Sequence, residues 1–223
     1  MARWWALGAM VLLCAGGLLS AGCRTTPPPR PTAVVAPKPS VALRVFIYVD
    51  DEFCQRFGPR DTAARAVVND WLYACEQQFR LGFPEQRVSL DLAGIGAWSI
   101  PAGQRDGRAI WRQAVPTTWP EHVRANCLIA LTGRRGVCWS GVARWPRLYA
   151  KAQEHEPVSQ NTIALLCHEM SHWFGAEDII DAKLPEASVM NYRDAHDGWR
   201  EGRLCWDKRN RALMAAKLAS WTS

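Results

Sequence analysis

The residues of this chain whose types and spacing could do chemistry lie close together, in the short segment 168–172. His168 and His172 are four positions apart, so on a helix both rings share one face, with Cβ atoms about 5–6 Å apart. One zinc ion can bridge two such rings, because its bonds to histidine nitrogen are about 2.0–2.1 Å long. Glu169 follows the first histidine, where a carboxylate can reach a zinc-bound water and accept its proton. The segment therefore predicts one catalytic Zn²⁺ ion with Glu169 as its general base.

A third ligand is expected a few residues further on, because a catalytic zinc takes three protein ligands and keeps one position open. Gly175 can end the helix in a sharp turn, since glycine tolerates positive φ. The chain can then fold back to present Asp178, whose short anionic side chain suits zinc. We therefore predict His168, His172 and Asp178 as the metal ligands. Three other residues could take the third place: Glu177, Asp181 and His196.

The whole zinc segment, H-E-x-x-H-x-x-G-x-x-D, resembles that of the metzincin family of zinc peptidases. Most metzincins have a third histidine where this chain has Asp178, and some bacterial members have aspartate there. The sequence Ser-Val-Met-Asn-Tyr at 188–192 resembles the tight Met-turn that follows in these enzymes. The resemblance implies that Met190 forms a hydrophobic floor beneath the metal. It also implies a catalytic role for Tyr192, at the metal or the oxyanion, with ordinary packing as the alternative.

Two further runs, 131–133 and 141–143, resemble the strand pair whose edge binds extended substrate in the adamalysin-like branch of metzincins. The resemblance is loose outside the zinc segment and the Met-turn. It implies a zinc-dependent endopeptidase that acts on a peptide or protein lying along the strand near 139–144. A zinc hydrolase acting on cell-wall peptides remains an alternative. An exported binding lipoprotein with a structural zinc is a second alternative, although structural zinc sites usually have four protein ligands, many of them cysteines, and no open position.

The elements that must position these residues follow from the spacing of apolar side chains. Strands are expected where apolar residues alternate or form short runs, at 41–49, 87–92, 127–132 and 137–144. The last two should form a hairpin through a turn at 133–136. Helices are expected at 61–79, with Asp61 as its cap, and at 105–115, 161–174 and 207–219. Together with the resemblance, this predicts an α/β (α+β) metzincin-like zincin domain, in which a twisted mixed sheet carries an active-site helix and a C-terminal helix.

The first residues resemble an export signal. Arg3 gives a positive start, 7–19 is almost wholly apolar, and small residues follow at 20–22. This apolar core is too short for a comfortable membrane span. The sequence Leu-Ser-Ala-Gly-Cys that ends at Cys23 resembles a bacterial lipobox, which implies that Cys23 carries lipid. An ordinary cleaved signal with an incidental Cys23 is the alternative.

Three parts of the chain follow from this pattern. Residues 1–22 are expected to be a lipoprotein signal peptide, and 23–40 the lipidated cysteine with a proline-rich extended linker. Residues 41–223 are expected to form the zinc peptidase domain. The protein would then be lipid-anchored in a bacterial cell envelope, at the outer membrane or facing the periplasm. Arg24 after the cysteine favours the outer membrane.

The charge pattern argues against a nucleic-acid partner. The net charge is +6, but Arg3, Arg24, Arg30 and Lys38 all precede the expected domain, and every acidic residue lies at or after Asp50. The basic excess therefore sits mainly in the leader and linker, and does not form a track for phosphates.

Cysteine usage fits an exported chain, since six cysteines remain in the expected domain once Cys14 leaves with the leader and Cys23 takes lipid. An even number in such a chain predicts three disulfides. From proximity along the chain and the expected hairpin, we predict the pairs Cys54–Cys75, Cys127–Cys138 and Cys167–Cys205.

Overall fold

The computed structural model describes residues 40–138, 140–154, 158–180, 187–191, 198–200 and 202–221. The predicted signal peptide, Cys23 and nearly all of the predicted linker lie outside these residues. Within the described part of the chain, no helix combines the length and the apolar character needed to cross a membrane.

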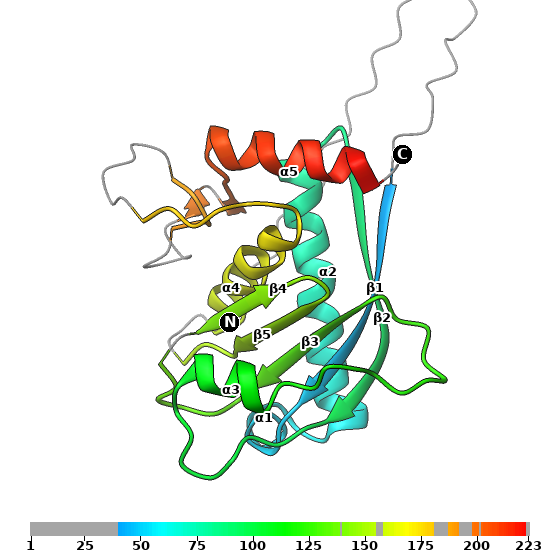
Figure 1. Ribbon diagram of the computed structural model, residues 1–223, viewed down its shortest axis with the longest axis vertical. Coiled ribbons are helices and arrows are strands. Elements are labelled where there is room, and N and C mark those ends of the chain that lie inside the picture. The colour runs from blue at the N-terminus through cyan, green and yellow to red at the C-terminus, as the bar shows by residue number, and fades with distance from the viewer. Residues whose placement is uncertain are drawn as a thin grey trace, which may run out of the picture. The chain divides into compact units, whose positions relative to one another are not determined.

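A five-stranded sheet forms the centre of the fold, with strands in the order β2-β1-β3-β5-β4 (Figure 1). Strands β2, β1, β3 and β5 run parallel to one another, and β4 lies antiparallel to β5 at one edge. The predicted mixed sheet is therefore confirmed. Its strands are β1 (Ser40–Val49), β2 (Arg87–Ala97), β3 (Cys127–Thr132), β4 (Gly141–Arg144) and β5 (Arg147–Lys151). A separate two-stranded sheet pairs β6 (Trp199–Arg200) with β7 (Arg203–Leu204).

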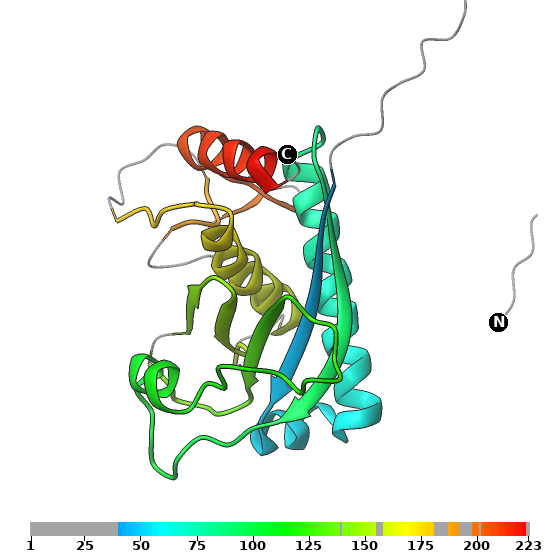
Figure 2. The same ribbon diagram turned by 45° about the vertical axis from the view of Figure 1, so that its right-hand side comes forward.

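Helices cover both faces of the five-stranded sheet. Figures 1 and 2 show α2 running beside β1 and β2. Helix α4 lies further along the sheet, and α5 lies near one end of these two helices. The larger core cluster joins α2 and α4 to one face of the sheet, whereas α3 belongs to a smaller cluster on the other face. The helices are α1 (Asp51–Phe57), the π-helical turn η1 (Arg60–Ala64), α2 (Arg65–Gly82), α3 (Gly107–Gln113), α4 (Val158–Trp173) and α5 (Lys208–Trp221).

Strand alternation explains the two clusters. Along β3, Ile129 and Leu131 point into the larger cluster, while Leu128 and Ala130 point into the smaller one. All four side chains are buried. A strand that is apolar on both faces is typical of a parallel sheet with helices on each side, so the α/β class follows directly from the sequence of β3.

Aromatic packing joins the helices that flank the candidate site. Phe79 of α2 meets Phe174 edge-on at 5.4 Å between ring centroids and stacks on Trp206 at 5.5 Å. Trp206 also donates a 2.8 Å hydrogen bond from its indole nitrogen to the Ser171 hydroxyl in α4. These contacts fix the C-terminal end of α4 against α2 and the segment that enters α5.

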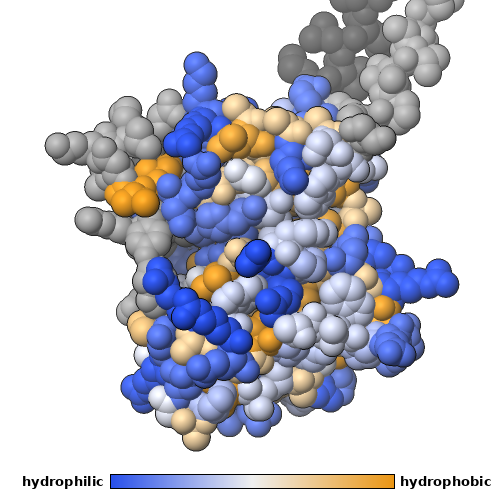
Figure 3. All heavy atoms as spheres, in the orientation of Figure 1, coloured by the Kyte–Doolittle hydropathy of each residue, from blue (hydrophilic) through white to orange (hydrophobic). Residues whose placement is uncertain are grey.

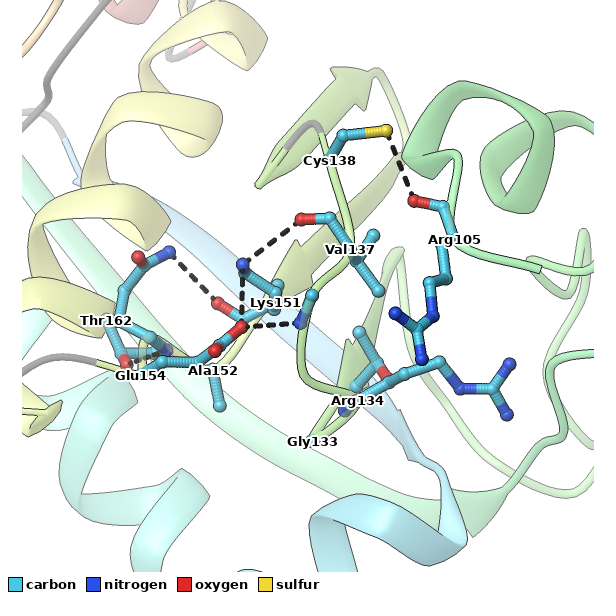
Figure 4. Close-up of polar contacts among 12 residues, drawn as sticks. Arg105, Gly133, Arg134, Val137, Cys138, Lys151, Ala152, Glu154 and Thr162 are labelled. Carbon is cyan, nitrogen blue, oxygen red and sulfur yellow. Dashed lines mark hydrogen bonds and ion pairs between the residues drawn. The ribbon is translucent and has the colours of Figure 1, made fainter. Parts of the chain in front are cut away.

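The predicted hairpin between 127–132 and 137–144 is wrong. β3 pairs in parallel with β5, and β5 is the antiparallel partner of β4. The chain after β3 crosses the end of β5, where Lys151 Nζ donates to Val137 O at 3.1 Å and Gly136 N donates to Glu154 Oε1 at 2.9 Å (Figure 4). It then returns as the edge strand on the far side of β5.

Most of the predicted helices and strands are confirmed with shifted ends, whereas α1, β5 and the short strands β6 and β7 were not predicted. Helix α1 begins where Asp50 accepts a 2.8 Å hydrogen bond from Phe53 N, and β5 is a run of only five residues. The predicted capping role of Asp61 is wrong, because the helical segment begins at Pro59 with no side-chain cap. Asp61 is the second residue of this segment and pairs with Arg60.

The three predicted disulfides are wrong, because all six cysteines of the described domain are free thiols. Cys127 opens β3, whereas Cys138 follows the opposite end of that strand and lies 3.2 Å from Arg105 O (Figure 4). A strand of this length separates them by about 20 Å. Cys75, expected to pair with Cys54, instead contacts the thiol of Cys167.

Candidate metal centre

Helix α4 places His168, Glu169 and His172 in the interior of the domain. His168 is 7% exposed and Glu169 is 5% exposed. The two imidazole rings lie on the same side of the helix, with centroids 5.0 Å apart and planes nearly perpendicular. Gly175, at φ 88°, turns the chain sharply after the helix, as expected.

The turn brings Asp178 back to the two histidines. Asp178 Oδ1 lies 3.2 Å from His168 Nε2 and 3.4 Å from His172 Nε2. A tetrahedral zinc with bonds of about 2.0–2.1 Å keeps its ligand atoms about 3.3 Å apart, so these distances fit one ion. Within the described residues, this is the single group of histidine, cysteine and acidic side chains with ligand atoms this close together.

The other candidates for the third ligand are not in this group. The Glu177 side chain is largely exposed and pairs with Arg209. Asp181, His196 and the predicted catalytic Tyr192 lie outside the described residues. The structure thus brings together His168, Glu169, His172 and Asp178.

Backbone carbonyls determine which nitrogen each ring offers. His168 Nδ1 lies 2.7 Å from Val189 O, and His172 Nδ1 lies 2.9 Å from Ala176 O. A carbonyl can only accept, so both Nδ1 atoms donate, and a neutral ring then presents the lone pair of Nε2. Those lone pairs face the Asp178 carboxylate, which is also an acceptor. Three converging acceptors fit a cation, and hydrogen-bonded Nδ1 atoms are usual for zinc-bound histidines.

The electrostatics of the group also favour positive charge. Burial alone would raise the pKa of Asp178, but its bonds to His168 and His172 outweigh that effect and hold the pKa well below its usual range. Burial alone would lower the pKa of His172, but the bond to Asp178 and the charge of Glu169 raise it. Both shifts belong to the metal-free site, where a proton donated by a ring nitrogen to Asp178 occupies the position that a cation could take.

Glu169 is chemically distinct from the three acceptors. Its burial raises the pKa of the carboxyl to about 7, against the opposing effect of the two histidines. Gly141, the first residue of β4, lies against it: a Cβ added there would stand 2.3 Å from Glu169 Oε1. The edge strand can therefore pass directly beside the carboxylate only because residue 141 has no side chain. From the sequence, Gly141 was expected only as part of the substrate-binding strand, and its contact with Glu169 was not predicted.

The segment that resembles a Met-turn supports the metal group from below. Val189 and Met190 are fully buried, and Val189 supplies the carbonyl that holds His168. Met190 O accepts a 2.8 Å hydrogen bond from Ile179 N, next to Asp178. The turn thus contacts the His168 ring and the residue after Asp178. Met190 is buried in the core, and its predicted place beneath the metal stays a prediction.

Comparisons with known proteins identify no family. No protein-family model matches the chain, and no curated protein matches it. A solved structure described as a chaperone–substrate complex is similar over 83% of this chain and 35% of that one, with 14% identity and a TM-score of 0.53. The chain therefore spans about a third of that protein.

Another similar structure is the archaemetzincin of Methanopyrus kandleri, matched over 79% of this chain and 96% of that one, with 18% identity and a TM-score of 0.47. At such identities, likeness to solved structures concerns the fold alone. The chemistry of this chain is therefore argued from its own residues.

Proposed function

We propose that this protein is a zinc-dependent endopeptidase. The observation that carries the proposal is the convergence of His168 Nε2, His172 Nε2 and Asp178 Oδ1 beside the buried carboxylate of Glu169. A structural zinc needs no acid in that position, whereas a hydrolase needs a base next to its metal. The binding-module alternative explains this carboxylate less well.

In this proposal the three acceptors hold the ion and leave a fourth position open. A bound zinc supplies a Lewis acid that polarises a carbonyl and lowers the pKa of a water molecule to about 7. Glu169 takes the proton of the attacking water and returns it to the leaving amine. In the metal-free site burial raises the pKa of Glu169 to about 7, and a bound cation would lower it, which favours the carboxylate form that a base needs.

The proposed substrate is a peptide in extended conformation. Strand β4 lies at the edge of the sheet and, of the described strands, pairs with β5 alone. An extended peptide can add to such an edge through main-chain hydrogen bonds. Gly141 lies at the end of β4 nearest the carboxylate, so a peptide along β4 would bring its backbone to Glu169. Cell-wall peptides fit the same edge.

The test is a single substitution measured in two ways. Glu169→Ala should retain zinc, assayed by elemental analysis, but lose hydrolysis of fluorescein-labelled casein. Glu177→Gln is a matched control, because Glu177 is an exposed acid in the loop that follows α4, and this variant should keep both properties. Undiminished hydrolysis by the Glu169 variant would refute the role of Glu169 as the base. A wild-type protein that holds no zinc would refute the assignment as a zinc peptidase.

We also propose anchoring through Cys23 in a bacterial envelope. This rests on the lipobox-like sequence alone, since Cys23 lies outside the described residues. Cys23→Ala should move the protein from the membrane fraction to the soluble fraction. An unchanged distribution would contradict the anchor without touching the peptidase proposal.

A further inference from the structure

Asp178 needs support from outside its own loop, because it follows the end of a helix and its side chain is one-third exposed. Its direction depends on the two peptide groups that flank its Cα. The peptide after it is held where Ile179 N donates to Met190 O at 2.8 Å. What holds the peptide before it is therefore part of the metal site.

That support comes from Asn210, in the first turn of α5. Asn210 Oδ1 accepts from Glu177 N at 2.7 Å, and Asn210 Nδ2 donates to Glu177 O at 2.9 Å. The Glu177 carbonyl belongs to the peptide group that precedes Asp178. One side-chain amide thus holds the peptide groups on both sides of Glu177. Together with the hydrogen bond from Ile179 N to Met190 O, it holds both peptide groups that flank Asp178.

The amide of Asn210 is itself held in one orientation. Its Nδ2 donates a second hydrogen bond of 2.8 Å to Asp207 Oδ2, and Ser188 Oγ donates to the same oxygen at 2.9 Å. Ser188 also accepts from Met190 N at 3.2 Å, which joins this network to the turn beneath the metal group. Asn210 and Ser188 are each 2% exposed, so water competes little for these bonds.

We infer that Asn210 is a positioning residue for the third metal ligand: its amide holds Glu177, and through it Asp178, in the place where Asp178 completes the zinc site. We call the two bonds between Asn210 and Glu177 the Asn210 clamp. The inference rests on the proposed zinc site, and it extends that site to a helix 30 residues beyond the last ligand. Residues that orient ligands in this way typically change metal affinity by about 10–100-fold.

The test uses Asn210→Asp, which keeps the shape of the side chain but replaces the donor Nδ2 with an acceptor. Aspartate is tolerated in the first turn of a helix, but the new carboxylate also faces Asp207 Oδ2, so the fold of the variant is checked directly. Arg209→Ala is the matched control, because Arg209 is the neighbouring exposed residue and its ion pair within the described residues is with the Glu177 side chain. Circular dichroism and urea unfolding confirm that each variant is folded.

The measured quantity is the zinc dissociation constant, from competition with a chelating dye. We expect Asn210→Asp to weaken zinc binding by about 10–100-fold, and Arg209→Ala to change it by less than about twofold. In an Asp178→Ala background, Asn210→Asp should cause no further loss. Affinity within twofold of the wild type would overturn the inference, as would an equal loss in both backgrounds. A wild-type protein that binds no zinc would instead refute the proposed function.

Discussion

The burial of Glu169 should destabilise the zinc-free protein at neutral pH. The pKa of this carboxyl is raised from 4.5 to about 7, so between these values the unfolded chain holds fewer protons than the folded one. Stability therefore falls as the pH rises from 4.5 to 7 and is constant above that window. At 1.36 kcal/mol for each unit of pKa, the full effect is about 3 kcal/mol.

Glu169→Gln removes this titration while it preserves the shape of the side chain. Without zinc, the variant and the wild type should have similar free energies of unfolding at pH 4.5. At pH 8 the variant should be more stable by up to about 3 kcal/mol. Added zinc should shrink the difference, because a nearby cation favours the charged carboxylate.

The assay is urea unfolding in EDTA at pH 4.5, 6 and 8, repeated with zinc. Glu121→Gln is the control, because Glu121 is exposed and its substitution should change stability by less than about 0.5 kcal/mol at every pH. The reasoning is refuted if the Glu169 variant is no more stable than the wild type at pH 8. It is also refuted if the two differ by the same amount at each pH.

Three further predictions concern other contacts. Gly141→Ala should lower kcat on casein by on the order of 10²-fold while zinc is retained, and should lower the free energy of unfolding less in a Glu169→Ala background, which removes the three atoms that the new methyl group would meet; an equal loss of stability in both backgrounds would contradict the clash. Phe79→Ala should lower the free energy of unfolding by about 3–5 kcal/mol, measured in urea, because this fully buried ring packs on Phe174 and Trp206. A thiol reagent should modify exposed Cys138 in the native protein and reach buried Cys127 only on unfolding; equal rates would contradict the burial.

The candidate metal group was predictable because its geometry is local. Two histidines four residues apart on a helix must share a face, and Gly175 marks the turn that returns Asp178. His168, His172 and Asp178 lie within a short stretch of backbone, so local geometry is enough to bring their side chains together. The strand that opens the domain was predictable for the same reason, since its alternation is contained within ten residues.

The pairing of strands was not predictable in this way. The run 127–132 is followed by a turn and a further strand, which is the pattern of a hairpin. Nothing in that pattern reveals that β5, only five residues long, inserts between them. Loop contacts from Lys151 and Glu154 decide the path, and they join residues whose proximity exists only in the folded sheet. The predicted Cys127–Cys138 pair failed with the hairpin on which it depended.

Asn210 illustrates a functional signal that sequence alone conceals. The buried stripe of α5 consists of Asn210, Met214 and Leu218, at four-residue spacing. An apolar residue at 210 would continue the stripe, and a buried amide is unfavourable unless it is hydrogen-bonded. Its partners on Glu177 and Asp207 meet that requirement. The stripe begins with this polar residue where α5 meets the loop of Asp178, so α5 contacts the candidate metal site as well as the core.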